Sequence, residues 1–166
     1  MWFFVDAETD GLYGAFLSVA AIVTDEKGEE LDRFYGAVRV TQEDISTPWV
    51  RENVFPSLAR AETFYETEHA LLESFWQFWL RYREQAACVT HVPYPVESRL
   101  FLSCVTKDPR EREFLAPFPM YDLATLLRSK GLDFHGELPL LSGMELKPHD
   151  AMNDVRMMAA LWRKLL

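Results

Sequence analysis

The sequence has few cysteines. Cys88 and Cys104 are the only two, and neither stands in a CxxC or Cys/His pattern. Their number and spacing argue against a disulfide framework and against a structural zinc site, and they favour a reducing compartment.

Long apolar runs are also missing. The apolar start at Met1 reaches Asp6 without a basic region and is too short for a signal peptide. No later apolar run approaches the length of a membrane-spanning helix. We therefore expect a cytoplasmic protein with no membrane partner.

Basic residues are outnumbered by acidic ones, 17 to 26, which gives a formal net charge of −9. Affinity for phosphate comes largely from Lys and Arg, so this balance counts against a protein that coats nucleic acid. It counts less against a metal-dependent nuclease, because two divalent cations would cancel the charge of about four site carboxylates.

The length of 166 residues and the apolar fraction of 49% fit one folded domain. No internal repeat, low-complexity tract or Gly/Ser linker divides the chain. We therefore treat residues 1–166 as a single domain.

Apolar stretches near the start predict three strands joined by tight turns, at 2–6, 16–24 and 31–40. Later patterns indicate a short helix, a long helix, a strand, a helix, a strand leading into a helix, and a closing helix. Their ranges are 45–58, 64–82, 86–92, 96–105, 120–130 and 149–166, and the charged stretch 107–113 is expected to be a solvated loop. This order predicts an α/β fold with a mixed central sheet flanked by helices.

The long helix at 64–82 carries two apolar stripes. Leu72, Phe75 and Trp79 belong to one stripe, and Leu71 and Phe78 form the other. A helix this apolar is either enclosed within the fold or partly covered by another subunit. Both readings stay open, so a homodimer is possible.

Acidic residues stand at the ends of two of these elements. Asp6 and Glu8 are two apart on a strand, so their side chains point to the same side, at the strand end where open α/β sheets bind ligands. His149 stands at the start of the last predicted helix. Asp154 lies in its second turn, on the side that faces the interior. The alternatives are a solvated strand end for the first pair and, for Asp150 with Asp154, an exposed acidic edge.

Together these segments resemble the DEDDh 3′→5′ exonucleases, which include ribonuclease T, oligoribonuclease and polymerase proofreading domains. The family's first motif, Asp-x-Glu-x-x-Gly, matches residues 6–11, and its third, His-x-Ala-x-x-Asp, matches residues 149–154. The order of strands and helices also fits. The resemblance implies a ribonuclease H-like fold over the whole chain.

The second family motif is where the chain departs. The family has a strand, an Asn-containing turn and then Phe-Asp opening a helix, whereas here Pro93-Tyr94-Pro95 replaces the turn. Glu97, in the first turn of the following helix, is the candidate for the family's aspartate. Its alternative role is that of an acid that favours the helix N-terminus.

The resemblance implies two-metal hydrolysis of phosphodiester bonds at a 3′ end. Asp6, Glu8, Glu97 and Asp154 would bind two Mg²⁺ or Mn²⁺ ions, and His149 would act as general base. The first loop would hold the terminal nucleotide. The residues expected to do so are Thr9, Gly11, Leu12 and Tyr13.

The expected partner is the 3′ end of a single-stranded nucleic acid. The segment 49–56 is similar to part of a bacterial exoribonuclease branch, which slightly favours RNA over DNA. The main rival is a nuclease-derived binding or regulatory module with little catalysis, suggested by the glutamate at the second motif and by the acidic surface. A phosphatase acting on small nucleotides with the same metals is a third reading.

Overall fold

The computed structural model describes residues 1–133 and 138–166. Six of the described segments form one mixed sheet in the order β4-β3-β2-β1-β5-β6. The strands are β1 (Trp2–Thr9), β2 (Phe16–Thr24), β3 (Glu30–Val38), β4 (Thr63–Tyr65), β5 (Ala87–Thr90) and β6 (Met120–Asp122). β2 is antiparallel to both of its neighbours, and the other five strands run parallel to one another.

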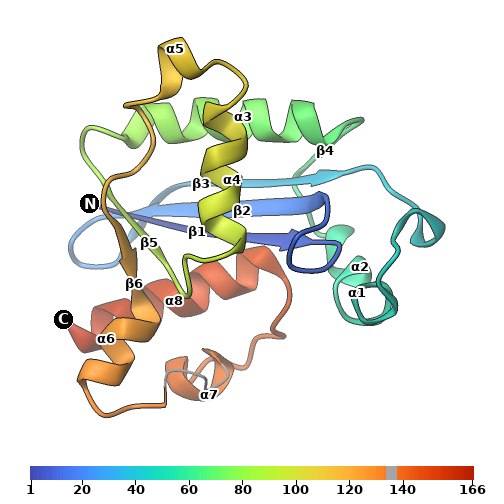
Figure 1. Cartoon of the computed structure of the whole chain (residues 1–166). Coiled ribbons are helices and arrows are strands. Elements are labelled where there is room, and N and C mark those ends of the chain that lie inside the picture. The colour runs from blue at the N-terminus through green and yellow to red at the C-terminus, as the bar shows by residue number, and fades with distance from the viewer. Residues whose placement is uncertain (134–137) are drawn as a thin grey trace.

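Helices cover both faces of this sheet. The described helices are η1 (Gln42–Asp44), α1 (Pro48–Asn53), α2 (Phe55–Leu58), α3 (Glu68–Tyr82), α4 (Val96–Val105), α5 (Pro109–Arg112), α6 (Leu123–Ser129), α7 (Leu138–Ser142) and α8 (Ala151–Leu165). Figure 1 shows α8 on one face and α3 with α4 on the other, and each side has its own hydrophobic core. β2 is buried at all nine positions because both of its faces pack against helices.

The predicted α/β fold with a mixed sheet is confirmed, including the meander of β1, β2 and β3. Some predicted elements differ from the structure, among them the single short helix at 45–58, which is two helices, α1 and α2. The segment 64–82 is not helical throughout, because Thr63–Tyr65 pairs with β3 as a parallel edge strand. The helix α3 starts only at Glu68, where the side chain of Thr67 accepts a hydrogen bond from the backbone of Ala70.

The charged stretch 107–113 is exposed to solvent except at Arg112, as expected, but it is not a loop throughout, because it contains α5. Arg112, in this helix, forms an ion pair with Glu73 of α3 at 2.7 Å and donates to the backbone oxygen of Cys104 in α4. These contacts hold the stretch against two helices.

Both apolar stripes of α3 are buried within the chain. Phe75 and Phe78 pack against Phe3 of the sheet, and Trp79 packs against Phe101 of α4. The enclosed reading therefore accounts for the apolar helix. A homodimer stays a prediction. No helix among the described residues has both the length and the apolar character needed to span a membrane.

Candidate metal centre

Three carboxylates meet at the carboxyl end of β1. Asp6 and Glu8 stand two residues apart on β1, so both face the side of the sheet that α8 covers. Asp154 comes from the first turns of α8. One ligand oxygen from each of the three lies within 4.8 Å of the others. The sheet and α8 thus bring together residues that are far apart in the sequence.

The position of Asp154 is set by the start of α8. Asp150 is the N-cap of this helix, and its side chain accepts hydrogen bonds from the backbone N–H groups of Met152 and Asn153. The backbone N–H of His149 donates to the Asp154 carboxylate at 3.0 Å. The carboxylate of Asp154 is therefore held at the helix entrance.

Glu97 joins the cluster from the other side of β1. It lies in the first turn of α4, is 7% exposed, and accepts a hydrogen bond from the backbone N–H of Ala7, which stands between Asp6 and Glu8. β5 pairs with β1 only as far as Phe4. Beyond that point the Glu97 side chain, and not a strand, accepts the hydrogen bond from the backbone of Ala7. Glu97 thus lies beside the other acids although the second motif departs from the family pattern.

The four carboxylates are unfavourable as charges in this environment. Burial, and after it repulsion from neighbouring carboxylates, raises the pKa of Asp6 well above its usual value and that of Glu8 to about 8. Burial raises the pKa of Glu97 to about 8 and that of Asp154 to about 7, against the opposing effect of backbone hydrogen bonds. Among the ion pairs of residues 1–133 and 138–166, none supplies a Lys or Arg to these four acids.

This donor set fits hard divalent cations. Its ligand atoms are all carboxylate oxygens, which suit Mg²⁺ and Mn²⁺, whereas zinc sites more often use Cys and His. Ser18 of β2 stands directly across from Glu8, and its buried hydroxyl has no hydrogen-bond partner among the described residues. Positive charge and bound water would satisfy groups that the protein itself leaves unsatisfied.

His149 lies outside the group of three closest ligands but next to it in the chain. It is exposed, has a left-handed backbone with φ of 60°, and its ring meets that of Trp49 edge-on at 4.8 Å. The imidazole is therefore accessible at the entrance to α8, with Trp49 of α1 as its neighbour.

The loop after β1 is held rigidly. The Asp10 carboxylate accepts hydrogen bonds from the backbone of Ser46 and Thr47, and although burial acts in the opposite direction, these bonds lower its pKa. Gly11 has φ of +77°, and a Cβ there would lie only 3.2 Å from the hydroxyl of Thr47. Glycine is thus favoured at this turn both by its conformation and by the close approach of Thr47.

The loop presents two of the predicted substrate residues and hides a third. Leu12 and Tyr13 are 61% and 67% exposed, which leaves their side chains available for contact. Thr9 is buried, so its side chain offers little surface to a ligand.

Sequence reasoning missed how deeply Asp150 is buried. It is 1% exposed, accepts a hydrogen bond from Arg60 at 2.9 Å and another from the Tyr35 hydroxyl at 3.2 Å. Since Asp154 is buried as well, the alternative of an exposed acidic edge is wrong. The signal was an aspartate directly before a helix, the usual N-cap residue.

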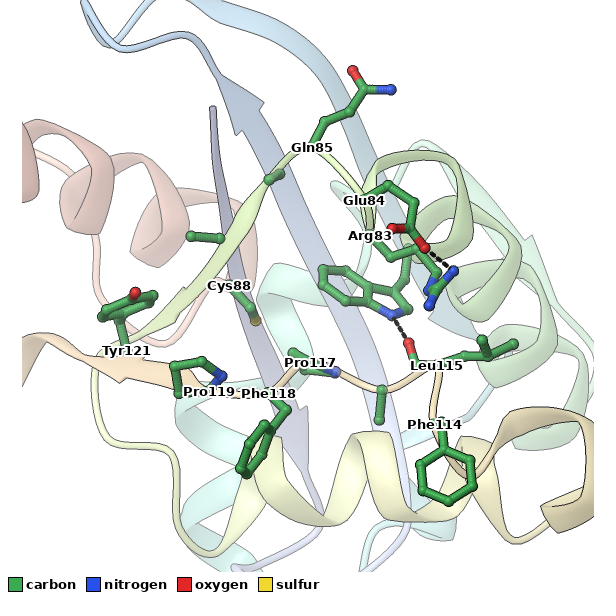
Figure 2. Close-up of a pocket in the computed structure, with 14 residues that line it drawn as sticks. Arg83, Glu84, Gln85, Cys88, Phe114, Leu115, Pro117, Phe118, Pro119 and Tyr121 are labelled. Atoms are coloured by element: carbon green, nitrogen blue, oxygen red, sulfur yellow. Dashed lines mark hydrogen bonds and ion pairs between the residues drawn. The ribbon is translucent and has the colours of Figure 1, made fainter.

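A separate cavity of about 400 Å³ lies at the other end of the sheet from the acidic cluster, where strands β5 and β6 begin. Figure 2 shows Phe114 and Phe118 at its rim, together with Arg83 and Glu84, which form an ion pair. Among the described residues that line it, Glu84 is the only carboxylate, so they do not offer a carboxylate cluster.

Comparisons with solved structures identify the same architecture in known nucleases. E. coli exonuclease I, in a zinc-bound complex with single-stranded DNA, superposes with a TM-score of 0.74 at 18% identity, covering 98% of this chain and 39% of that one. Exonuclease X in complex with 5′-overhanging duplex DNA superposes with a TM-score of 0.60 at 18% identity, covering 99% of this chain and 90% of that one. No family model and no curated protein matches the sequence.

The chain spans about two fifths of the length of exonuclease I. At this level of identity, the similarity establishes the fold. The α/β fold expected from the sequence is therefore confirmed as the ribonuclease H-like fold of exonucleases I and X.

Proposed function

We propose that this protein is a metal-dependent 3′→5′ exonuclease that hydrolyses phosphodiester bonds at the 3′ end of a single-stranded nucleic acid. The observation that carries the proposal is the convergence of Asp6, Glu8 and Asp154 within 4.8 Å, with Glu97 beside them. A buried acidic cluster at the carboxyl end of a central strand is equipped to hold cations next to a phosphate.

In this proposal Asp6, Glu8, Glu97 and Asp154 hold two Mg²⁺ or Mn²⁺ ions. When bound, such ions lower the pKa of a coordinated water and stabilise charge on the leaving oxygen. His149 accepts the proton of the attacking water, since its side chain is exposed and its backbone is hydrogen-bonded to Asp154 of the cluster.

The first loop holds the terminal nucleotide. The exposed side chains of Leu12 and Tyr13 pack on its base, while backbone groups from Thr9 to Gly11 contact the sugar and phosphate. Packing on a base tolerates any sequence, because every base has an apolar face.

The choice between DNA and RNA rests on two observations. The exonuclease I structures contain single-stranded DNA, which supports DNA as a substrate. The similarity of segment 49–56 to an exoribonuclease branch favours RNA. However, Trp49 of this segment contacts His149, and that contact would be equally useful with a DNA or an RNA strand. The RNA preference stays a prediction, and both strands belong in the test.

The test is gel analysis of 5′-labelled single-stranded DNA and RNA of one sequence, with Mg²⁺, Mn²⁺ or EDTA. We expect a ladder that shortens from the 3′ end, abolished by EDTA and by Asp154→Asn. Glu84→Gln, at the other end of the sheet, is the matched control and should leave the ladder unchanged. Strands that stay intact with every metal would refute the proposal.

The rival is a binding or regulatory module, and the observation that favours it is the glutamate at the second motif. If catalysis is lost because Glu97 is one methylene too long, Glu97→Asp should restore hydrolysis to an inactive protein. If the protein is active as purified, Glu97→Gln should lower activity by at least about 10- to 100-fold, the usual loss for residues that only support metal ligands.

A further inference from the structure

The loop that replaces the family's Asn-containing turn presents an exposed aromatic ring just before the helix that carries Glu97. Tyr94 stands three residues before Glu97 and is 69% exposed. The side chain of Tyr94 lies near that of Tyr13, and its proximity raises the pKa of the Tyr13 hydroxyl. Two exposed rings, one in the loop that follows Glu8 of β1 and one in the loop before the helix that carries Glu97, therefore lie next to each other.

Both rings rest on supported backbone. Ser98, in the first turn of α4, donates to the backbone oxygen of Pro93 from its own backbone at 2.8 Å and from its hydroxyl at 2.7 Å. On the other side, Arg99 donates to the backbone oxygen of Leu12 at 3.5 Å, with its guanidinium 4.3 Å from the ring centre of Phe16. Binding at these rings would therefore require little ordering of the loops.

The net negative charge of the protein limits the affinity that electrostatic attraction can supply for a nucleic-acid strand. With 26 acidic and 17 basic residues, electrostatic attraction to phosphates contributes little affinity for a strand. Stacking of bases on aromatic side chains supplies affinity that does not depend on Lys or Arg. A surface with this charge needs stacking more than a basic one does.

We propose that Tyr94, paired with Tyr13, forms a stacking site for an unpaired base of the strand whose 3′ end lies at the acidic cluster. The inference rests on the proposed function and deepens it, because it assigns a substrate role to the loop 93–95. The site takes any nucleobase with a free face and excludes one engaged in a duplex.

The test is a binding measurement in which hydrolysis is slowed. In a His149→Ala background with Mg²⁺, the affinity for a short 5′-fluorescein oligothymidylate is measured by fluorescence anisotropy. Tyr94→Ala should weaken binding by roughly 5- to 160-fold, which corresponds to about 1–3 kcal/mol for one stacked base. Tyr94→Phe should retain most of the affinity, because it keeps the ring and loses only the hydroxyl.

Phe118→Ala is the matched control. Phe118 is 98% exposed and also precedes a proline, but it lies at the rim of the cavity at the other end of the sheet (Figure 2). Its removal should leave affinity unchanged. A loss equal to that of Tyr94→Ala would mean that aromatic exposure in general, and not this position, supports binding, which would overturn the inference.

Abasic oligonucleotides locate the contact. Removing the base at one position near the 3′ end should weaken binding to the parent and abolish the difference between the parent and Tyr94→Ala. If wild-type protein degrades the strand while Tyr94→Ala binds as the parent does, the inference fails and the exonuclease stands. Binding that depends on Tyr94 without any cleavage supports the inference and removes the catalytic proposal. Absence of binding by the parent overturns the inference, whereas the exonuclease proposal is decided by the cleavage assay.

Discussion

His149 directly precedes Asp150, the N-cap of α8; its backbone is left-handed, and its ring contacts that of Trp49. Its backbone supports Asp154, but its imidazole lies outside the set of three closest ligands. The side chain and the backbone of this residue therefore have separate roles, and a side-chain substitution tests only the first.

His149→Ala should lower kcat by about 10²- to 10⁴-fold, the usual contribution of a general base. The backbone hydrogen bond to Asp154 persists in the variant, so the affinity for Mn²⁺ should change little. Turnover and calorimetric Mn²⁺ binding are measured on the same preparation. A loss of metal affinity as large as the loss of kcat would show that His149 is a ligand and not a base.

For single residues, the sequence predicts those candidate metal ligands that are recognisable from their residue type and local spacing. Asp6 and Glu8 follow an apolar strand, and Asp154 faces inward from a helix, so their chemistry was readable without the fold. The contacts of Asp150 with Tyr35 and Arg60 could not be predicted, because they join residues 115 and 90 positions apart.

The element that matters most for the centre is the start of α8. Asp150 caps this helix and ties it to β3 through Tyr35 and to the segment after α2 through Arg60. Because the helix carries Asp154, any movement of its first turn moves a candidate ligand.

Asp150→Ala should lower the free energy of unfolding by about 1–3 kcal/mol, since it removes an N-cap worth about 0.5–2 kcal/mol and a charge-assisted hydrogen bond. Arg60→Ala should cost less, because the Arg60 side chain is 56% exposed and the cap stays in place. Urea denaturation of both variants gives the comparison. Equal losses would contradict the capping account.

Elements with a strong apolar pattern were predictable, and short ones were not. The predicted bounds of β2 agree with the structure because all nine of its positions are buried. β4 was missed since it has only three residues, and Phe64 continued the apolar pattern of the following helix. Its pairing with β3 depends on a neighbour that local sequence does not reveal.

At the scale of the molecule, the cluster concentrates negative charge in a protein that is already acidic. Glu8 and Glu97 have pKa values of about 8 and Asp154 one of about 7, whereas unfolded carboxyl groups titrate near pH 4. Between these values the folded protein keeps protons that the unfolded chain has lost. Without metal, stability should therefore fall as pH rises from about 4 to about 8.

Thermal unfolding in EDTA should give a lower Tm at pH 8 than at pH 6.5, and Mg²⁺ should raise Tm more at pH 8, where the carboxylates are free of protons. Glu97→Gln removes one of these protonation sites, so its Tm should depend less on pH. His91, whose pKa is lowered by burial, has the opposite trend at lower pH, which is why the comparison starts at 6.5. A wild-type Tm that is unchanged or rises between pH 6.5 and 8 would contradict the account.

The gathering of distant acids is a property of the whole fold. Asp6 and Asp154 stand near opposite ends of the chain, and only the crossing of α8 over β1 and β2 brings them together. The family motifs predicted this gathering by resemblance. The position of Glu97 against the backbone of Ala7 needed the structure, because it depends on where β5 ends.

The most direct measurement is anomalous diffraction from crystals grown with Mn²⁺. We expect a peak for a manganese ion coordinated by carboxylate oxygens of Asp6, Glu8 and Asp154. Glu97 should bind the same ion or a second one beside it. Manganese bound elsewhere, with no peak at these carboxylates in fully deprotonated protein, would contradict it.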